Sequence, residues 1–158
     1  MAVELNEIDL RIVNLLRHDG RTPAAQIAEQ VGLSRPAVAD RIEKLERLGV
    51  IRGTTVVVDP AAVGQTITAF VSARGAHLST KAWSAFEQLM KLDEVLEVHT
   101  VAGDDCFLVK VRTDSIRSLN ELVQKMTAAP LSLNTRTTIV MRTHCEKVGG
   151  ITLGEDEK

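Results

Sequence analysis

The sequence predicts an α+β protein made of a winged helix-turn-helix unit, residues 1–60, and a ferredoxin-like βαββαβ unit, residues 66–142. Two observations carry this prediction. Up to Gly49, apolar residues recur with the period of amphipathic helices, interrupted by short glycine-containing breaks. From Val50 onwards β-branched residues become frequent, and strand-like runs then alternate with helix-like runs.

The first helix is expected from Leu5 to His18 and is closed by Gly20. Asn6 suits the N-cap, and Glu7 and Asp9 place negative charge at the positive end of the helix dipole. Its apolar face consists of Ile8, Ile12, Leu15 and Leu16.

Two further helices are expected before residue 50. The second has Thr22 as its cap and Pro23 in its first turn, and it stops at Gly32. The third is capped by Ser34 and ends at Gly49. The inward residues are Ile27, Ala28 and Val31 in the second helix, and Val38, Ile42, Leu45 and Leu48 in the third.

A strand or wing is expected next, in the run IRGTTVVVDP, because it is rich in β-branched residues and is stopped by Asp59-Pro60. Residues 61–65 are expected to link the two units. Four strands follow at 66–73, 95–102, 106–111 and 133–141, with helices at 80–92 and 115–128 and a tail, 143–158, that is partly mobile. The run CFLV, which begins at Cys106, is typical of a central, covered strand. The expected inward residues of the two helices are Trp83, Phe86, Leu89 and Met90, then Ile116, Leu119, Leu122, Val123 and Met126.

The short break at Gly32 favours a helix-turn-helix motif, here Ala24 to Glu43. In that motif the second helix places its N-terminal residues at base edges in the major groove, where Arg reads guanine O6 and N7. We therefore expect double-stranded DNA to be contacted by Ser34, Arg35, Pro36, Ala37, Asp40, Arg41 and Lys44, with Thr22 and Arg52 at the flanks.

The charge of this region is modest. Residues 1–60 contain eight Lys/Arg and nine Asp/Glu, whereas residues 34–52 contain five Lys/Arg and three Asp/Glu. One copy should therefore bind DNA weakly, and affinity should come from two or more copies bound together. The alternative interpretation is a plain helical bundle, in which a pair such as Glu43–Arg47 only supports its helix.

Composition excludes several functions. Aromatic residues make up 3% of the 158 residues, which argues against a stacking platform for single strands, and the net charge of −2 excludes a strongly basic coat. There is no glycine-rich phosphate loop and no nucleophile elbow, so we expect neither an enzyme nor a cofactor. No zinc spacing, and hence no metal site, is formed by His99, Cys106, His144 and Cys145.

The cellular location follows from what the chain lacks. Two cysteines make no disulfide framework, and the start MAVELNEIDL has no apolar run of the kind found in a signal peptide. No stretch approaches the roughly 20 apolar residues of a membrane span. We expect a cytoplasmic protein with reduced thiols and no membrane partner.

The motifs also resemble those of the Lrp/AsnC (leucine-responsive, feast/famine) transcription factors. The similarity runs over about residues 4–142 and includes VLEVHTVAGDDCFLVKV and TRTTIV. The matching N-terminal features are Leu5-x-x-x-Asp9, Asp19-Gly20-Arg21, Val31-Gly32-Leu33-Ser34, Arg41-x-x-x-Leu45 and Gly49-x-Ile51.

The resemblance implies that the second unit is a RAM domain, which forms homodimers through its sheets and assembles further into tetramers or octamers. It also implies that an effector, usually an amino acid, binds near the turn Gly103, Asp104, Asp105 and Cys106, with the last strand, including Thr135 and Thr137, nearby. Many members have Gly-Asp-aromatic-Asp at this turn. Here Asp105 takes the aromatic position and Cys106 the second acid, so Asp104 or Asp105 would have to hold an ammonium group.

Together these features predict a sequence-specific, amino-acid-responsive DNA-binding regulator that reads DNA with the helix starting at Ser34. The alternative from another class is a small-molecule-sensing oligomer whose helical unit binds protein instead of DNA.

Overall fold

A computed structural model describes residues 3–75 and 79–147. Contacts divide the chain into two compact units, the first running to Val57 and the second from Val58 to Glu146. Residues 61–65, expected as a linker, lie inside the second unit and include the short 3-10 helix η1, Ala61–Val63. Each unit is described by itself.

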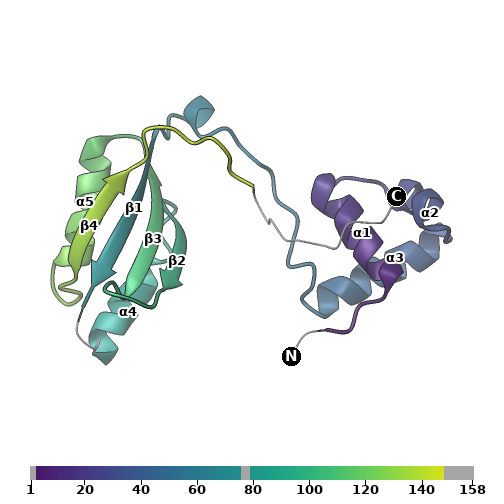
Figure 1. Ribbon diagram of the computed structural model, residues 1–158, viewed down its shortest axis with the longest axis horizontal. Coiled ribbons are helices and arrows are strands. Elements are labelled where there is room, and N and C mark those ends of the chain that lie inside the picture. The colour runs from purple at the N-terminus through teal and green to yellow at the C-terminus, as the bar shows by residue number, and fades with distance from the viewer. Residues whose placement is uncertain (1–2, 76–78, 148–158) are drawn as a thin grey trace. The chain divides into compact units, whose positions relative to one another are not determined.

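The first unit holds three helices, α1 (Glu7–His18), α2 (Ala24–Val31) and α3 (Arg35–Arg47), drawn in purple and blue in Figure 1. The turn between α2 and α3 contains Gly32, whose φ of +70° is a left-handed conformation that glycine adopts without strain. The core is aliphatic, as expected from the scarcity of aromatic residues, and its most buried members are Ile12, Ile27, Val38 and Leu45.

Side-chain caps fix where two of these helices begin. Asn6 accepts a hydrogen bond from the backbone N–H of Asp9, whose carboxylate faces the N–H of Asn6 in return. Ser34 Oγ accepts from the N–H of Ala37 at the start of α3. Both caps confirm the sequence prediction.

Thr22 is not the cap of α2. Pro23 occupies that position and makes no side-chain cap. The Thr22 hydroxyl donates instead to the carbonyl of Asp19, which precedes it in the chain, at 2.7 Å. The predicted burial of Leu48 is also wrong. This residue lies at the end of α3, past the last turn that packs on the core, and its side chain is exposed.

The strand predicted after α3 is absent from the described residues between Val50 and Asp59. The backbone N–H groups of Val50 and Ile51 bond back to the carbonyl of Leu45, and the segment beyond them pairs with no strand among residues 3–75 and 79–147. Val56, Val57 and Val58 are 66%, 74% and 54% exposed. The sequence has strand propensity here, but a strand needs a partner to form its hydrogen bonds.

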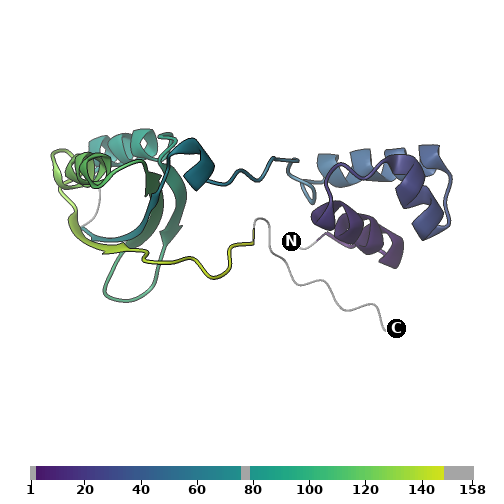
Figure 2. The same cartoon turned by 90° about the horizontal axis from the view of Figure 1, so that it is seen from above.

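The second unit has the βαββαβ order that the sequence predicts. Its elements are β1 (Ile67–Arg74), α4 (Thr80–Leu89), β2 (Val95–Thr100), β3 (Phe107–Thr113), α5 (Ile116–Thr127) and β4 (Asn134–Ile139). The strands form one antiparallel sheet in the order β2-β3-β1-β4, which makes β3 a central strand as expected. Both helices cover one face of the sheet, as Figures 1 and 2 show.

The core of this unit lies between the helices and the inward residues of β1 and β3. Val71, Val109 and Val111 are fully buried, and the rings of Phe86 and Phe107 lie 4.6 Å apart between centroids. Three residues predicted to face inward do not: Trp83, Met90 and Ile116 are exposed. Each helix has only one stripe that reaches the sheet, and these residues lie outside it.

The other face of the sheet carries Phe70 of β1 opposite Lys110 of β3, according to the strand register. The chain after β4 lies against this face, where Glu146 is held by Lys110 and Arg112. Within the tail, 143–158, which was predicted to be partly mobile, Glu146 is held by these two contacts. Residues 148–158 of the tail lie outside the described residues.

Candidate nucleic-acid interface and ligand-binding turn

The surface of α3 that faces away from the core begins with small residues. Pro36 and Ala39 are exposed there, on the side of the helix opposite the buried Val38 and Leu45. One turn further along, Asp40 and then Lys44 are exposed as well. A helix with a small-residue front can approach a groove closely, so this end of α3 has the shape that base contact requires.

Three cations of this region have no partner within the described residues. The side chains of Arg35, Lys44 and Arg52 are exposed and make no hydrogen bond or ion pair there. They are therefore available to an anion without breaking any contact of the fold. Ser34 is exposed, Thr22 and Ala37 are half-buried, and all the predicted DNA-binding residues belong to this one unit.

Arg41, which was predicted to contact DNA, forms an ion pair within the helical unit. Its Nη1 lies 2.7 Å from Oδ1 of Asp9, and the exposed fractions of the two side chains are 29% and 4%. The pair joins the first turn of α1 to the middle of α3. Because a buried carboxylate without a partner is costly, this pair supports the packing of α1 on α3, and the contact of Arg41 with DNA stays a prediction.

Glu43 and Arg47 form an exposed i,i+4 pair with 3.5 Å between Oε1 and Nη1. Such pairs contribute little to stability because water screens them.

Gly20, in the turn before α2, lies against the segment that follows α3. A Cβ at this position would meet Cγ2 of Thr54 at 2.8 Å, so the chain after α3 is held close to the α1–α2 turn.

In the sheet unit, the predicted effector turn joins β2 to β3. Gly103 has a φ of +133°, Asp104 is exposed and Asp105 is half-buried. The Cys106 N–H donates to the carbonyl of Ala73, and its Sγ lies 3.5 Å from the carbonyl of Gly75. The thiol is therefore turned towards the backbone after β1.

Sequence reasoning missed Arg136. Its Nη2 lies 3.3 Å from Oδ2 of Asp105, which brings β4 and the turn together as the predicted site requires. The register places Thr135 opposite Ala73 and Thr137 opposite Val71, so these threonines lie on the face of the sheet that the helices cover. Strand alternation alone puts residue 136 on the opposite face from its neighbours, and this signal could have identified it.

A second cluster of charges lies on the open face of the sheet, which is the face that the helices do not cover. Lys110 Nζ donates to Glu146 and, at 3.1 Å, to Glu97, and Arg112 donates to Glu146 at 2.9 Å. The hydrogen bond from Lys110 holds the pKa of Glu146 and that of Glu97 below the ordinary value, while Glu146 raises the pKa of Lys110. Sequence analysis did not find this cluster, because its members are far apart in the chain.

Two further observations concern metal ions and membranes. Within residues 3–75 and 79–147, no three His, Cys, Asp or Glu side chains lie close enough together to hold a metal ion. Among the helices described, none is long and apolar enough to cross a membrane.

The fold and these surfaces define a class of protein: a helix-turn-helix DNA-binding unit joined to a βαββαβ unit, the arrangement of a transcriptional regulator. Two family descriptions match in that order. The AsnC-type helix-turn-helix domain matches residues 5–46, and the Lrp/AsnC ligand binding domain matches residues 68–149. The chain belongs to the Lrp/AsnC family of transcriptional regulators, which are not enzymes.

Relatives of known name agree with this assignment. The chain is 36% identical over 149 residues to the HTH-type transcriptional regulator FL11 of Pyrococcus abyssi, covering 92% of this chain and 95% of that one. It is 33% identical over 143 residues to the leucine-responsive regulatory protein of Salmonella typhimurium, covering 87% of this chain and 85% of that one. The crystal structure of the leucine response regulatory protein LrpA of Mycobacterium tuberculosis matches with a TM-score of 0.80 and 31% identity, over 94% of this chain and all of that one.

Proposed function

We propose that this regulator reads a specific DNA sequence with the N-terminal half of α3, inserted into the major groove. The observation that carries the proposal is the exposed Arg35, which has no partner in the described chain and stands next to small residues at the start of the helix. Its guanidinium can donate to guanine O6 and N7. Ser34, Lys44 and Arg52 supply contacts to phosphates beside it.

The proposed binding form is at least a homodimer. With only four exposed cations that have no side-chain partner in the described chain, Arg21, Arg35, Lys44 and Arg52, and with exposed acids on the same unit, one copy provides few phosphate contacts. Val56, Val57 and Val58 are exposed and have no strand partner among the residues that the structure describes, so a second copy could supply one. The face of the sheet that the helices do not cover, where Phe70 is exposed beside the cluster of Lys110, Arg112 and Glu146, is a further surface for a second copy.

The proposed effector is an amino acid held near the turn Gly103–Cys106. Asp104 and Asp105 offer carboxylates to an α-ammonium group, and Arg136 offers a guanidinium to an α-carboxylate. The neutral thiol of Cys106 takes no part, since it faces the backbone of Gly75. The match to a ligand-binding domain and the name of the leucine-responsive relative support this assignment.

The effector changes DNA binding only if it binds two states of the oligomer with unequal affinity. A site at the edge of the sheet can report on packing between dimers, because Asp105 lies in the turn between β2 and β3, Arg136 lies on β4, and both are exposed in part. We place the protein in the cytoplasm, where the genome is accessible and where Cys106 and Cys145 remain free thiols.

The test is a binding titration of the full chain on labelled DNA from upstream of its own gene, against a scrambled duplex, with and without pooled amino acids. We expect tighter binding to the native duplex, a steep dependence on salt, and a shift on addition of amino acids. Equal binding to both duplexes would contradict sequence-specific reading of this site. Failure to bind DNA at low salt would favour the alternative, a sensing oligomer whose helices bind protein.

A further inference from the structure

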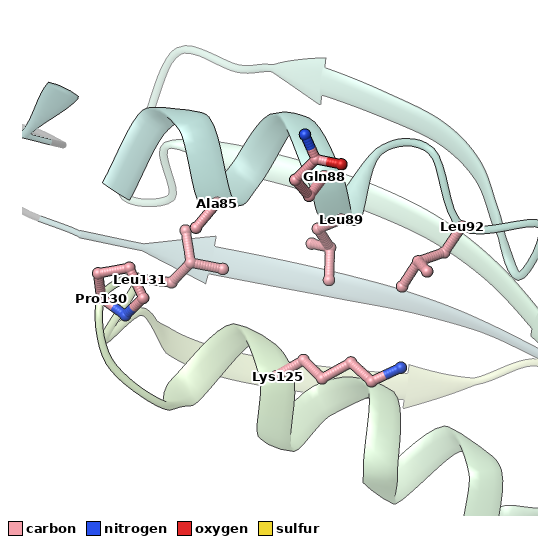
Figure 3. Close-up of a pocket in the computed structure, with 7 residues that line it drawn as sticks. All are labelled: Ala85, Gln88, Leu89, Leu92, Lys125, Pro130 and Leu131. Carbon is pink, nitrogen blue, oxygen red and sulfur yellow. The ribbon is translucent and has the colours of Figure 1, made fainter. Parts of the chain in front are cut away.

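A groove runs between the two helices of the sheet unit. Figure 3 shows Ala85, Gln88 and Leu89 of α4 on one wall and Lys125 of α5 on the other, with Leu131 from the connection after α5 at one end. The groove has a volume of about 290 Å³. That size suits a small organic molecule, because ligand pockets begin near about 300 Å³.

The groove is apolar at its base. Leu89 and Leu131 are only 4% and 6% exposed, so they form a floor, and the half-buried Leu92 continues it beyond the end of α4. The small side chain of Ala85 leaves the space open on the α4 wall. A branched aliphatic chain placed here would lose contact with water over most of its surface, which favours binding.

Two polar groups stand at this groove, and both can donate hydrogen bonds. The Lys125 side chain lies along the α5 wall, whereas the Gln88 amide of α4 points away from α5 (Figure 3). Neither side chain has a hydrogen-bond or ion-pair partner in the part of the chain that the structure describes. No carboxylate lines the groove, so the charge it presents is that of Lys125 alone.

We propose that this groove binds a small apolar monocarboxylate that has no amino group. Its carboxylate accepts a hydrogen bond from the Lys125 ammonium, and its aliphatic body lies on Leu89 and Leu131. An amino acid fits less well, because its ammonium group would meet the Lys125 charge and no acid. The residues of this site differ from those of the Gly103–Cys106 turn, so the proposal stands apart from the amino-acid site proposed above.

The test compares two molecules that differ only in the amino group: 4-methylpentanoate and leucine. Each is titrated into the full-length protein by calorimetry, and amide shifts are followed by NMR. We expect 4-methylpentanoate to bind with a Kd of about 0.1–1 mM and to shift Ala85, Leu89 and Lys125. Leucine should leave these amides unchanged even where it shifts the turn at residues 103–106.

Variants separate charge from shape. Lys125→Met keeps the aliphatic stem and should weaken binding about 5- to 10-fold, whereas Lys125→Arg should retain it. Ala85→Leu should abolish binding by filling the groove. Lys81→Met is the matched control, because Lys81 is an exposed lysine of α4 that does not line the groove. Circular dichroism confirms that each variant is folded.

The proposal would be overturned by absence of saturable 4-methylpentanoate binding up to about 10 mM. It would also be overturned if 4-methylpentan-1-ol bound equally well, if leucine shifted the same groove amides with equal affinity, or if Lys125→Met had no effect. None of these outcomes depends on DNA binding, so they are distinct from a failure of the proposed regulatory function.

Discussion

On α3 of the helical unit, the cations Arg35 and Lys44 have no partner in the described chain, whereas on β3 of the sheet unit Lys110 and Arg112 are held by carboxylates. The two groups also differ in exposure. Arg35 and Lys44 are exposed, while the side chains of Lys110 and Arg112 are each 14% exposed. Arg35 and Lys44 are therefore available to an external anion, whereas Lys110 and Arg112 fix the chain after β4 to the sheet.

Arg41 shows that the same contrast exists within the helical unit. It lies on α3 between Arg35 and Lys44 but is paired with Asp9. Residue type and helix position are therefore insufficient to assign a cation to DNA. The deciding property is whether a buried partner of opposite charge already holds it.

The largest effect is expected from Arg41→Met, which leaves the Asp9 carboxylate buried without its partner. We expect the helical unit to lose about 2–4 kcal/mol of unfolding free energy, near the lower part of the range for broken buried pairs because Arg41 is partly exposed. Chemical denaturation followed by circular dichroism measures it. The double variant Asp9→Asn, Arg41→Met should recover part of the loss. If Arg41→Met alone were as stable as the wild type, the Arg41–Asp9 pair would have no structural role.

The next effect is expected on DNA affinity. Arg35→Ala should cost about 1–3 kcal/mol on a specific duplex and much less on a scrambled one, because a base contact is lost. Lys44→Ala should weaken both duplexes alike and lower the salt slope by about one. Fluorescence anisotropy over a series of salt concentrations separates these patterns. Equal losses for Arg35→Ala on both duplexes would reassign Arg35 to phosphate contact.

A smaller effect is expected at the cap of α3. Ser34→Ala should lower the stability of the helical unit by about 0.5–1 kcal/mol, the lower part of the range for caps, because the Ser34 Oγ to Ala37 N distance is a long 3.4 Å. Ser34→Asp should retain the cap. Thr22→Ala is the comparison, and since Thr22 does not cap α2, a loss equal to that of Ser34→Ala would contradict the assignment of the caps.

The smallest effect concerns pH. The pKa of Glu146 is lowered from 4.5 in the folded chain, so its contribution to stability is present above that value and is lost as pH falls through the folded pKa. The raised pKa of Lys110 acts oppositely, since its contribution is present below 10.5 and is lost as pH rises through the folded pKa. Glu146→Gln should flatten the acid limb of the stability profile of the sheet unit between about pH 6 and pH 3. An unchanged profile would show that the cluster on the open face contributes no pH dependence.

The sequence predicted the helical unit well because its signals are local. Asn6, Ser34 and Gly32 act within one turn of their own helices, and the apolar periods need only neighbouring residues. The Arg41–Asp9 pair could not be predicted, because 32 residues separate its members and their contact depends on how α1 and α3 pack.

The sheet unit was predicted in element order but less well in its side chains. The order βαββαβ follows from alternating periods, yet the exposure of Trp83 depends on which stripe of α4 meets the sheet. The predicted strand at Val56–Val58 failed for a related reason, because strand propensity does not supply the partner strand. Arg136 and Glu146 could be located only from the register and from the path of the chain after β4.

The central claim is that two copies of α3 enter successive major grooves, and guanine-N7 protection footprinting tests it most directly. On a native duplex, we expect two clusters of protected guanines separated by about 10 base pairs or a multiple of that distance, with Arg35→Ala removing them while backbone protection remains. A single cluster, protection confined to the minor groove, or an Arg35→Ala footprint identical to that of the wild type would contradict this account.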